Sequence, residues 1–232
     1  MNTTRKTAAF VGAFFLISNA TFIIGVLLIE SMLSAPDSLT QLAAQRPQLV
    51  LGVLLELVNG LAYLGIAALM FPILRVRFES LALGYVIFRV LEFVMQIAGS
   101  LSPLILMSVG QELGSSGAAG LEAILLAQRV WASHMVSLTF GLGALLFYIM
   151  LLRTQLIPRF ISIWGLIGAG LVLLNLLFDL FGVSLGVFSN LGILMLLNEL
   201  FLGVWLIIKG FNPAAEISAA STVTQSRLAE QV

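Results

Sequence analysis

The sequence contains no cysteine, a single histidine (His134) and only two lysines. The absence of cysteine excludes disulfides, thiolate catalysis and cysteine-based metal sites. One histidine cannot supply both axial ligands of a membrane haem or a histidine cluster for a catalytic metal. Lys6 and Lys209 lie at the edges of apolar segments, so neither is placed to hold retinal as a mid-membrane Schiff base. We therefore expect no cofactor and no metal site within this chain.

Charge is also scarce. Only 9% of the 232 residues are charged and 60% are hydrophobic, whereas a soluble domain has about 25% charged residues. So apolar a chain cannot cover a surface that faces water, which indicates a membrane protein. Because 11 basic and 11 acidic residues cancel, there is no basic excess that would favour nucleic acid as a partner.

The apolar residues are grouped into segments long enough to cross a lipid bilayer, which takes about 20 residues. Backbone polar groups must be satisfied internally in lipid, so these segments should be helices. The first run is longer than the apolar core of a signal peptide, which favours an uncleaved helix. We predict an all-α membrane bundle of six transmembrane helices, at Ala8–Ser31, Leu49–Leu74, Leu81–Met107, Leu121–Leu152, Phe160–Phe181 and Val187–Ile208.

Turn-forming residues separate several of these segments, notably at 112–120 and 156–159. Basic residues mark the cytoplasmic side of membrane proteins, and most of those near segment ends fall on one side: Arg5, Lys6, Arg75, Arg77, Arg153, Arg159 and Lys209. We therefore expect both termini in the cytoplasm. The predicted domain spans 1–212, and residues 213–232, which are small and polar, are expected to form a disordered cytoplasmic tail.

Polar residues recur inside the apolar segments. Arg89, Glu92 and Gln96 follow helical spacing and share one face, at a depth where a charge costs about 2.5–3.5 kcal/mol. We therefore expect neither Arg89 nor Glu92 to face lipid. Similar faces occur on the other segments, so the candidate polar core comprises Glu56, Asn59, Arg89, Glu92, Gln96, Arg129, His134, Asp179, Asn198 and Glu199.

Two charge groupings follow from the expected depths of these residues. Arg89 should be shared by Glu92 and Glu199, and Arg129 should face Glu56 or Asp179. A paired charge avoids most of the penalty of an isolated one.

Two functions remain open for this core. It could bind or carry a small solute, a lipid headgroup or an ion. Alternatively, the charges could only set helix register in a structural or regulatory subunit, whose small-residue faces would contact other membrane proteins or further copies of the chain. An intramembrane enzyme is the weakest option, because no nucleophile and base are placed together.

Several stretches resemble a family of small bacterial integral membrane proteins that is described only as a domain of unknown function. They are RKTAAFVGAFFLI at 5–17, LVLGVLLELVNGLAYLGIAALMFPILR at 49–75, LALGYVIFRVLEF at 81–93, FGLGALLFYIMLLRTQLIPRFISIWGLIGA at 140–169 and LNELFLGVWLIIKGFNP at 197–213.

The resemblance implies a compact multi-pass bundle in the bacterial cytoplasmic membrane, with no established activity. It also implies that acidic residues at Glu56, Glu92 and Glu199 and basic residues at Arg89 and Arg129 belong to the family pattern. The chain is least similar to the family at 108–120 and near 182–190.

Overall fold

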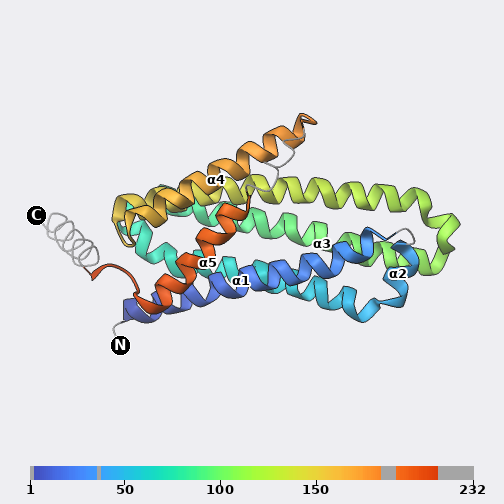
Figure 1. Cartoon of the computed structure of the whole chain (residues 1–232), viewed down its shortest axis with the longest axis horizontal. Helices are drawn as coiled ribbons and strands as arrows, with labels where there is room; N and C mark the ends of the chain where they lie inside the picture. Colours follow the sequence, from blue (N-terminus) through green and yellow to red (C-terminus); the bar gives the residue numbers. More distant parts are fainter. Residues whose placement is uncertain (1–2, 36–37, 184–191, 214–232) are drawn as a thin grey trace, which may run out of the picture.

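A computed structural model describes residues 3–35, 38–183 and 192–213 (Figure 1). Within them the regular secondary structure is helical, without strands, as the composition predicts. The start of the sixth predicted segment, at 187–191, and nearly all of the predicted tail, at 214–232, lie outside the described residues. The helices are α1 (Thr3–Leu33), α2 (Ser38–Ala44), α3 (Arg46–Thr154), α4 (Arg159–Leu180) and α5 (Gly192–Ile208).

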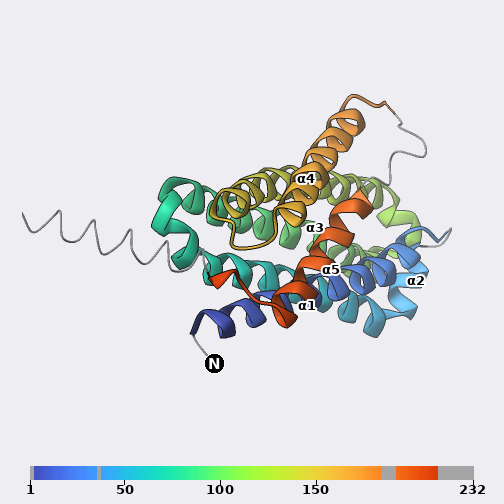
Figure 2. The same cartoon turned by 60° about the vertical axis from the view of Figure 1, so that its left-hand side comes forward.

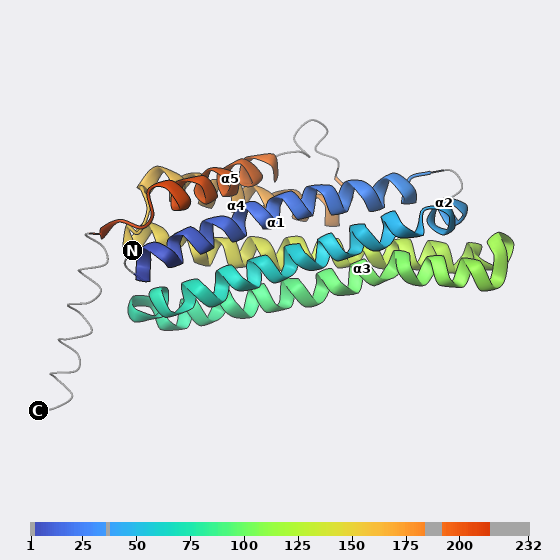
Figure 3. The same cartoon turned by 90° about the horizontal axis from the view of Figure 1, so that it is seen from below.

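The long helix α3 is not straight but folds back on itself twice. Gln96 Nε2 donates to the backbone oxygen of Glu56 at 2.9 Å, and Arg129 Nη1 donates to that of Gly99 at 3.2 Å. Residues 40 and 30 positions apart can meet only if the helix reverses between them, since a straight helix rises 1.5 Å per residue. Figure 3 shows both reversals, one at each end of the bundle. Thus α3 supplies three antiparallel passes.

At the break predicted at 112–120 the chain does reverse, between the second and third passes, but these residues are assigned to α3 rather than to a loop. No proline occurs between Pro103 and Pro158 to remove a backbone donor, and glycine weakens a helix by only about 1 kcal/mol. The break at 156–159 is present as predicted. There α3 ends at Thr154, the next residue Gln155 takes a left-handed conformation with φ of 55°, and Pro158 precedes the first residue of α4.

The start of α1 and the end of α5 lie together. Arg5 donates hydrogen bonds to the last carbonyls of α5, those of Leu206, Ile207 and Ile208, at 2.7–2.9 Å. Carbonyls in the last turn of a helix lack partners within that helix, although Leu206 also accepts from the Gly210 N–H at 3.1 Å. A guanidinium at a helix C-terminus also interacts favourably with the helix dipole. We call this end of the bundle, which Figures 1 and 3 show with the first reversal of α3 and the start of α4, the basic end. The opposite end is the α2 end.

The principal core lies toward the basic end. Tyr85, Phe147 and Tyr148 are buried there, and Phe147 contacts both tyrosine rings at centroid distances of 4.9 and 5.4 Å. A second, smaller core joins Leu42 of α2 to α1 and α3 at the α2 end. The space between the two cores holds the site described below.

Four helical stretches are long and apolar enough to cross a membrane: Thr4–Leu33, Arg46–Glu112, Gly120–Thr154 and Arg159–Leu180. At 17 residues, α5 is apolar but shorter. It packs against α1 and α4 and runs obliquely to α1 (Figure 2). The four longer stretches have the length and apolar character expected of transmembrane helices in a membrane protein.

Candidate functional site

A cavity of about 1070 Å³ lies within the bundle. Its walls come from α1, all three passes of α3, α4 and α5. Along α1 the lining runs from Phe15 to Leu33, so the cavity occupies the part of the bundle nearer the α2 end. On the other side of Phe15 the principal core is tightly packed.

Nine of the ten predicted core residues line this cavity: Glu56, Asn59, Arg89, Glu92, Gln96, Arg129, His134, Asp179 and Glu199. Asn198 does not. Its side chain is fully buried and donates to the backbone oxygen of Ile161 in α4 at 3.0 Å. Successive residues on a helix point about 100° apart. With Glu199 facing the cavity, Asn198 faces α4 instead.

Arg89 is enclosed at the inner part of the cavity. Its Nη1 lies 2.8 Å from Glu92 Oε2, an ion pair within one helical turn. Its guanidinium carbon also lies 5.1–5.5 Å from the ring centroids of Tyr63, Tyr85 and Phe140, within cation–π range. Its Nε is buried without a hydrogen-bond partner.

The predicted pairing of Arg89 with Glu92 is therefore confirmed, but Glu199 is not a second ion-pair partner. Among the described residues Arg89 forms an ion pair only with Glu92. Glu199 instead accepts a hydrogen bond from Asn19 Nδ2 at 3.3 Å.

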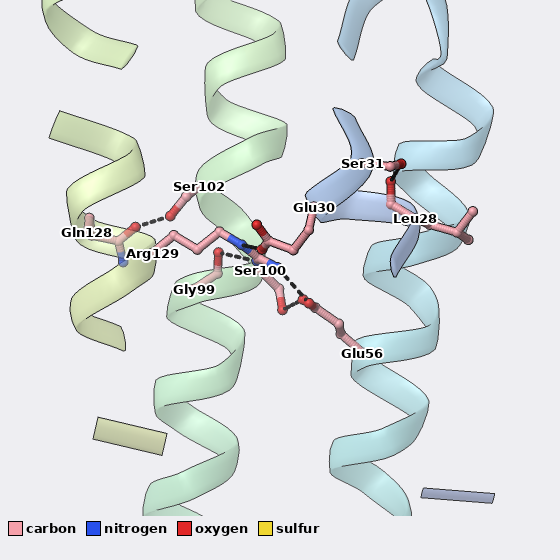
Figure 4. A network of polar contacts seen from close by, with 9 residues as sticks. All are labelled: Leu28, Glu30, Ser31, Glu56, Gly99, Ser100, Ser102, Gln128 and Arg129. Atoms are coloured by element: carbon pink, nitrogen blue, oxygen red, sulfur yellow. Dashed lines mark hydrogen bonds and ion pairs between the residues drawn. The ribbon is translucent and has the colours of Figure 1, made fainter. Parts of the chain in front are cut away.

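Arg129 forms a second charged network, which links α1 to the three passes of α3 (Figure 4). Its Nε lies 3.0 Å from Glu30 Oε1 and its Nη2 lies 2.9 Å from Glu56 Oε1. Ser100 donates from the second pass to the other oxygen of Glu56. The prediction that Arg129 faces Glu56 or Asp179 is confirmed for the first alternative, Glu56. Asp179, the other alternative, accepts a hydrogen bond from Asn175 at 3.1 Å.

Sequence reasoning missed Glu30 as a partner of Arg129. The available signal was depth, since Glu30 lies at the far end of the first apolar segment, level with Arg129. Ser18 was also missed. Its hydroxyl donates to Asn59 Oδ1 at 2.6 Å, and a lone serine in an apolar helix is too common to single out.

Neutral polar groups connect the two networks. Tyr63 donates from the first pass of α3 to Gln96 Oε1 at 2.6 Å, while the amide nitrogen of Gln96 donates back to the first pass at Glu56. Gln96 thus spans two passes with both ends of its amide, which holds the polar wall of the cavity in place.

His134 has an imidazole beside Trp131, with ring centroids 5.4 Å apart and nearly perpendicular. Its Nδ1 is buried without a partner. The part of the chain that the structure describes contains no group of three or more His, Cys, Asp or Glu side chains able to hold a metal ion.

Comparison with protein families identifies the chain. A family model described as a domain of unknown function (DUF4386) matches residues 10–210, and so covers every cavity-lining helix. The chain belongs to the DUF4386 family. No curated protein and no solved structure matches it. Membership agrees with the resemblance noted from the sequence.

Proposed function

We propose that this DUF4386 protein is an integral membrane protein of the bacterial cytoplasmic membrane. It crosses six times with both termini in the cytoplasm, and its charged cavity binds a small molecule that enters from the opposite side.

The outward faces of the helices support placement in lipid. Large apolar side chains are exposed along every long helix, among them Phe10, Leu27, Leu54, Leu61, Leu83, Ile87, Ile167 and Ile208. Water would disfavour such a surface, whereas hydrocarbon matches it.

The six crossings are assigned from α1, the three passes of α3, α4 and α5. At 17 residues α5 is about 26 Å long, slightly short of a hydrocarbon core of about 30 Å. The orientation rests on the basic residues, since basic side chains favour the cytoplasmic side. With the basic end in the cytoplasm, the cavity lies in the outer half of the bundle.

The observation that carries a binding function is the cavity itself. Its volume of about 1070 Å³ lies slightly above the usual range for small-molecule sites, about 300–1,000 Å³. Most of its lining is apolar, with a limited set of convergent charged and amide groups, as in many ligand sites.

We propose that the small molecule binds in the cavity and is not transported through the bundle. Beyond Arg89 the principal core closes the cavity with buried aromatic rings. Discontinuous helices often mark transporter sites, but α3 remains helical through Pro72 and Pro103.

The structural-subunit alternative draws less support. Several small residues it would use are engaged within the chain. A Cβ on Gly12 would lie 2.5 Å from the Gly203 oxygen, and one on Gly25 would lie 3.0 Å from the Gly52 oxygen. The ion pair of Arg89 and Glu92 also joins residues of one helical pass, so it cannot set register between passes.

Mass spectrometry tests the proposal. The protein in lipid nanodiscs is analysed intact and then denatured, to find a molecule that co-purifies in a fixed ratio. We expect such a molecule in the wild type and its loss in the Glu56→Gln and Glu199→Gln variants. Glu79→Gln, at an exposed position in the first reversal of α3, is the matched control. An empty and stable wild type would contradict the proposal.

A further inference from the structure

We propose that the ligand is an organic cation with an apolar body, and that the Glu199 carboxylate is its counter-charge. This inference rests on the proposed function, because it names the chemical class that the same cavity accepts.

The first support is the charge of the cavity lining. Two guanidinium groups, those of Arg89 and Arg129, face five carboxylates, those of Glu30, Glu56, Glu92, Asp179 and Glu199. With all five ionised, three negative charges are in excess. A cation entering this space is attracted, whereas an anion of the same size is repelled.

The second support is that, of the five lining carboxylates, only Glu199 is both shielded from water and without an ion-pair partner among the described residues. Glu92 pairs with Arg89, and Glu56 and Glu30 pair with Arg129. Asp179 is exposed, so water can solvate it. Glu199 is half-buried in the cavity wall and receives only the hydrogen bond from Asn19, at 3.3 Å.

The arginines are not available for an anionic ligand. Arg89 is held by Glu92 and enclosed by three aromatic rings. Arg129 is held by two carboxylates and by the oxygen of Gly99. An anion would have to displace these partners in a space that already carries excess negative charge.

The remaining lining indicates an organic rather than an inorganic cation. A metal ion such as Ca²⁺ needs six to eight oxygen ligands, and no cluster of metal-ligating side chains occurs among the described residues. The rest of the cavity wall is largely apolar, with Phe22, Met95, Val136, Val172 and Leu196 contributing. An apolar body would gain free energy by packing against these side chains.

Two ions of nearly equal size and opposite charge test the inference: radiolabelled tetraphenylphosphonium and tetraphenylborate. Equilibrium dialysis measures their binding to the full chain in nanodiscs, with empty nanodiscs subtracted to remove partitioning into lipid. We expect saturable binding of the phosphonium, near one per chain, and no saturable binding of the borate.

The Glu199→Gln variant should weaken phosphonium binding by about tenfold or more, because it removes a charged partner from a desolvated site. Glu199→Asp, which keeps the charge, should restore part of the affinity, and Glu79→Gln should bind like the wild type. Thermal unfolding of each variant establishes that it is folded.

Saturable binding of the borate, equal binding of both ions, or phosphonium affinity unchanged in Glu199→Gln would overturn the cation assignment and leave the binding function standing. Absence of saturable binding of either ion would also overturn it. In that case the co-purified molecule found by mass spectrometry decides separately whether the cavity binds another class of ligand.

Discussion

The two halves of the bundle are both mainly apolar but differ in how their helices pack. Toward the basic end, the helices are tightly packed around Tyr85, Phe147 and Tyr148. Toward the α2 end, they surround the cavity. The buried charged side chains, those of Glu56, Arg89 and Glu92, all line the cavity. In the described part of this protein, the buried charged side chains therefore lie at the cavity and not in the tightly packed half.

The oblique course of α5 accounts for part of the difference. The backbones of α1 and α5 approach closely where Gly12 meets Gly203, since a Cβ on Gly12 would lie 2.5 Å from the Gly203 oxygen, and Figure 1 shows α5 inclined to α1. From that contact toward Gly192, α5 continues along the cavity, to which Met195, Leu196 and Glu199 contribute.

Cysteine accessibility should separate the two halves most sharply, since the chain has no cysteine of its own. We expect Ser137→Cys, in the cavity wall, to react with a charged, membrane-impermeant thiol reagent added to right-side-out vesicles. Ser162→Cys, fully buried in α4, should remain unmodified from either side. Labelling is measured by the mass shift of the purified protein.

An exposed serine in the first reversal of α3 provides the orientation control. Ser80→Cys should react only in inverted vesicles if the basic end is cytoplasmic. Reaction of Ser80→Cys from outside would reverse the proposed orientation. Failure of Ser137→Cys to react from either side would show that water does not reach the cavity.

Loss of Arg89 should be the most damaging single change at the border between the halves. Arg89→Met leaves the Glu92 carboxylate buried and unpaired, which costs about 3–5 kcal/mol. The double variant Arg89→Met/Glu92→Gln should recover part of that loss, because no charge is left without a partner. Denaturant titration in detergent micelles gives both values, and equal stability of the single and double variants would argue against the pairing.

A smaller effect is expected from adding one methyl group to α4. A Cβ on Gly165 would overlap the ring of Tyr148, which is 1% exposed. Gly165→Ala should therefore destabilise the protein by about 1–3 kcal/mol. Gly170→Ala, in the same helix with no atom within 4 Å of its Cβ, should be neutral or stabilising by up to about 1 kcal/mol. Thermal unfolding compares the two, and equal losses would mean that the packed half tolerates expansion.

How far the sequence predicts these features depends on whether they lie within one helix. The all-α class and the apolar segments follow from composition and run length. The ion pair of Arg89 and Glu92 follows from their spacing, because residues three apart share a helix face. Such features can be predicted without knowing which helices lie next to each other.

Contacts between helices were predicted less well. Glu56 was one of two alternative partners expected for Arg129, whereas Glu30, 99 positions away, was not expected. Asn198 and Glu199 were both placed in the core, although adjacent helical residues cannot face the same space. Whether Asn198 or Glu199 faces the cavity depends on where α4 packs. The order and rotation of the helices in the bundle cannot be read from a single sequence.

The smallest loss of stability should come from Glu30, the more exposed partner of Arg129, which lies at the mouth of the cavity. Glu30 and Glu56 share Arg129, but their side chains are 50% and 6% exposed. Glu30→Gln leaves Arg129 paired with Glu56 and removes only a solvated partner, so the expected loss is below about 1 kcal/mol. Glu56→Gln removes the buried charge that also accepts from Ser100, and about 1–3 kcal/mol is expected. Urea titrations of both variants in detergent measure this difference. If Glu30→Gln were the more damaging, the link between α1 and α3 at the cavity mouth would depend on the exposed ion pair, and the division into a packed half and a hollow half would no longer describe where the stability lies.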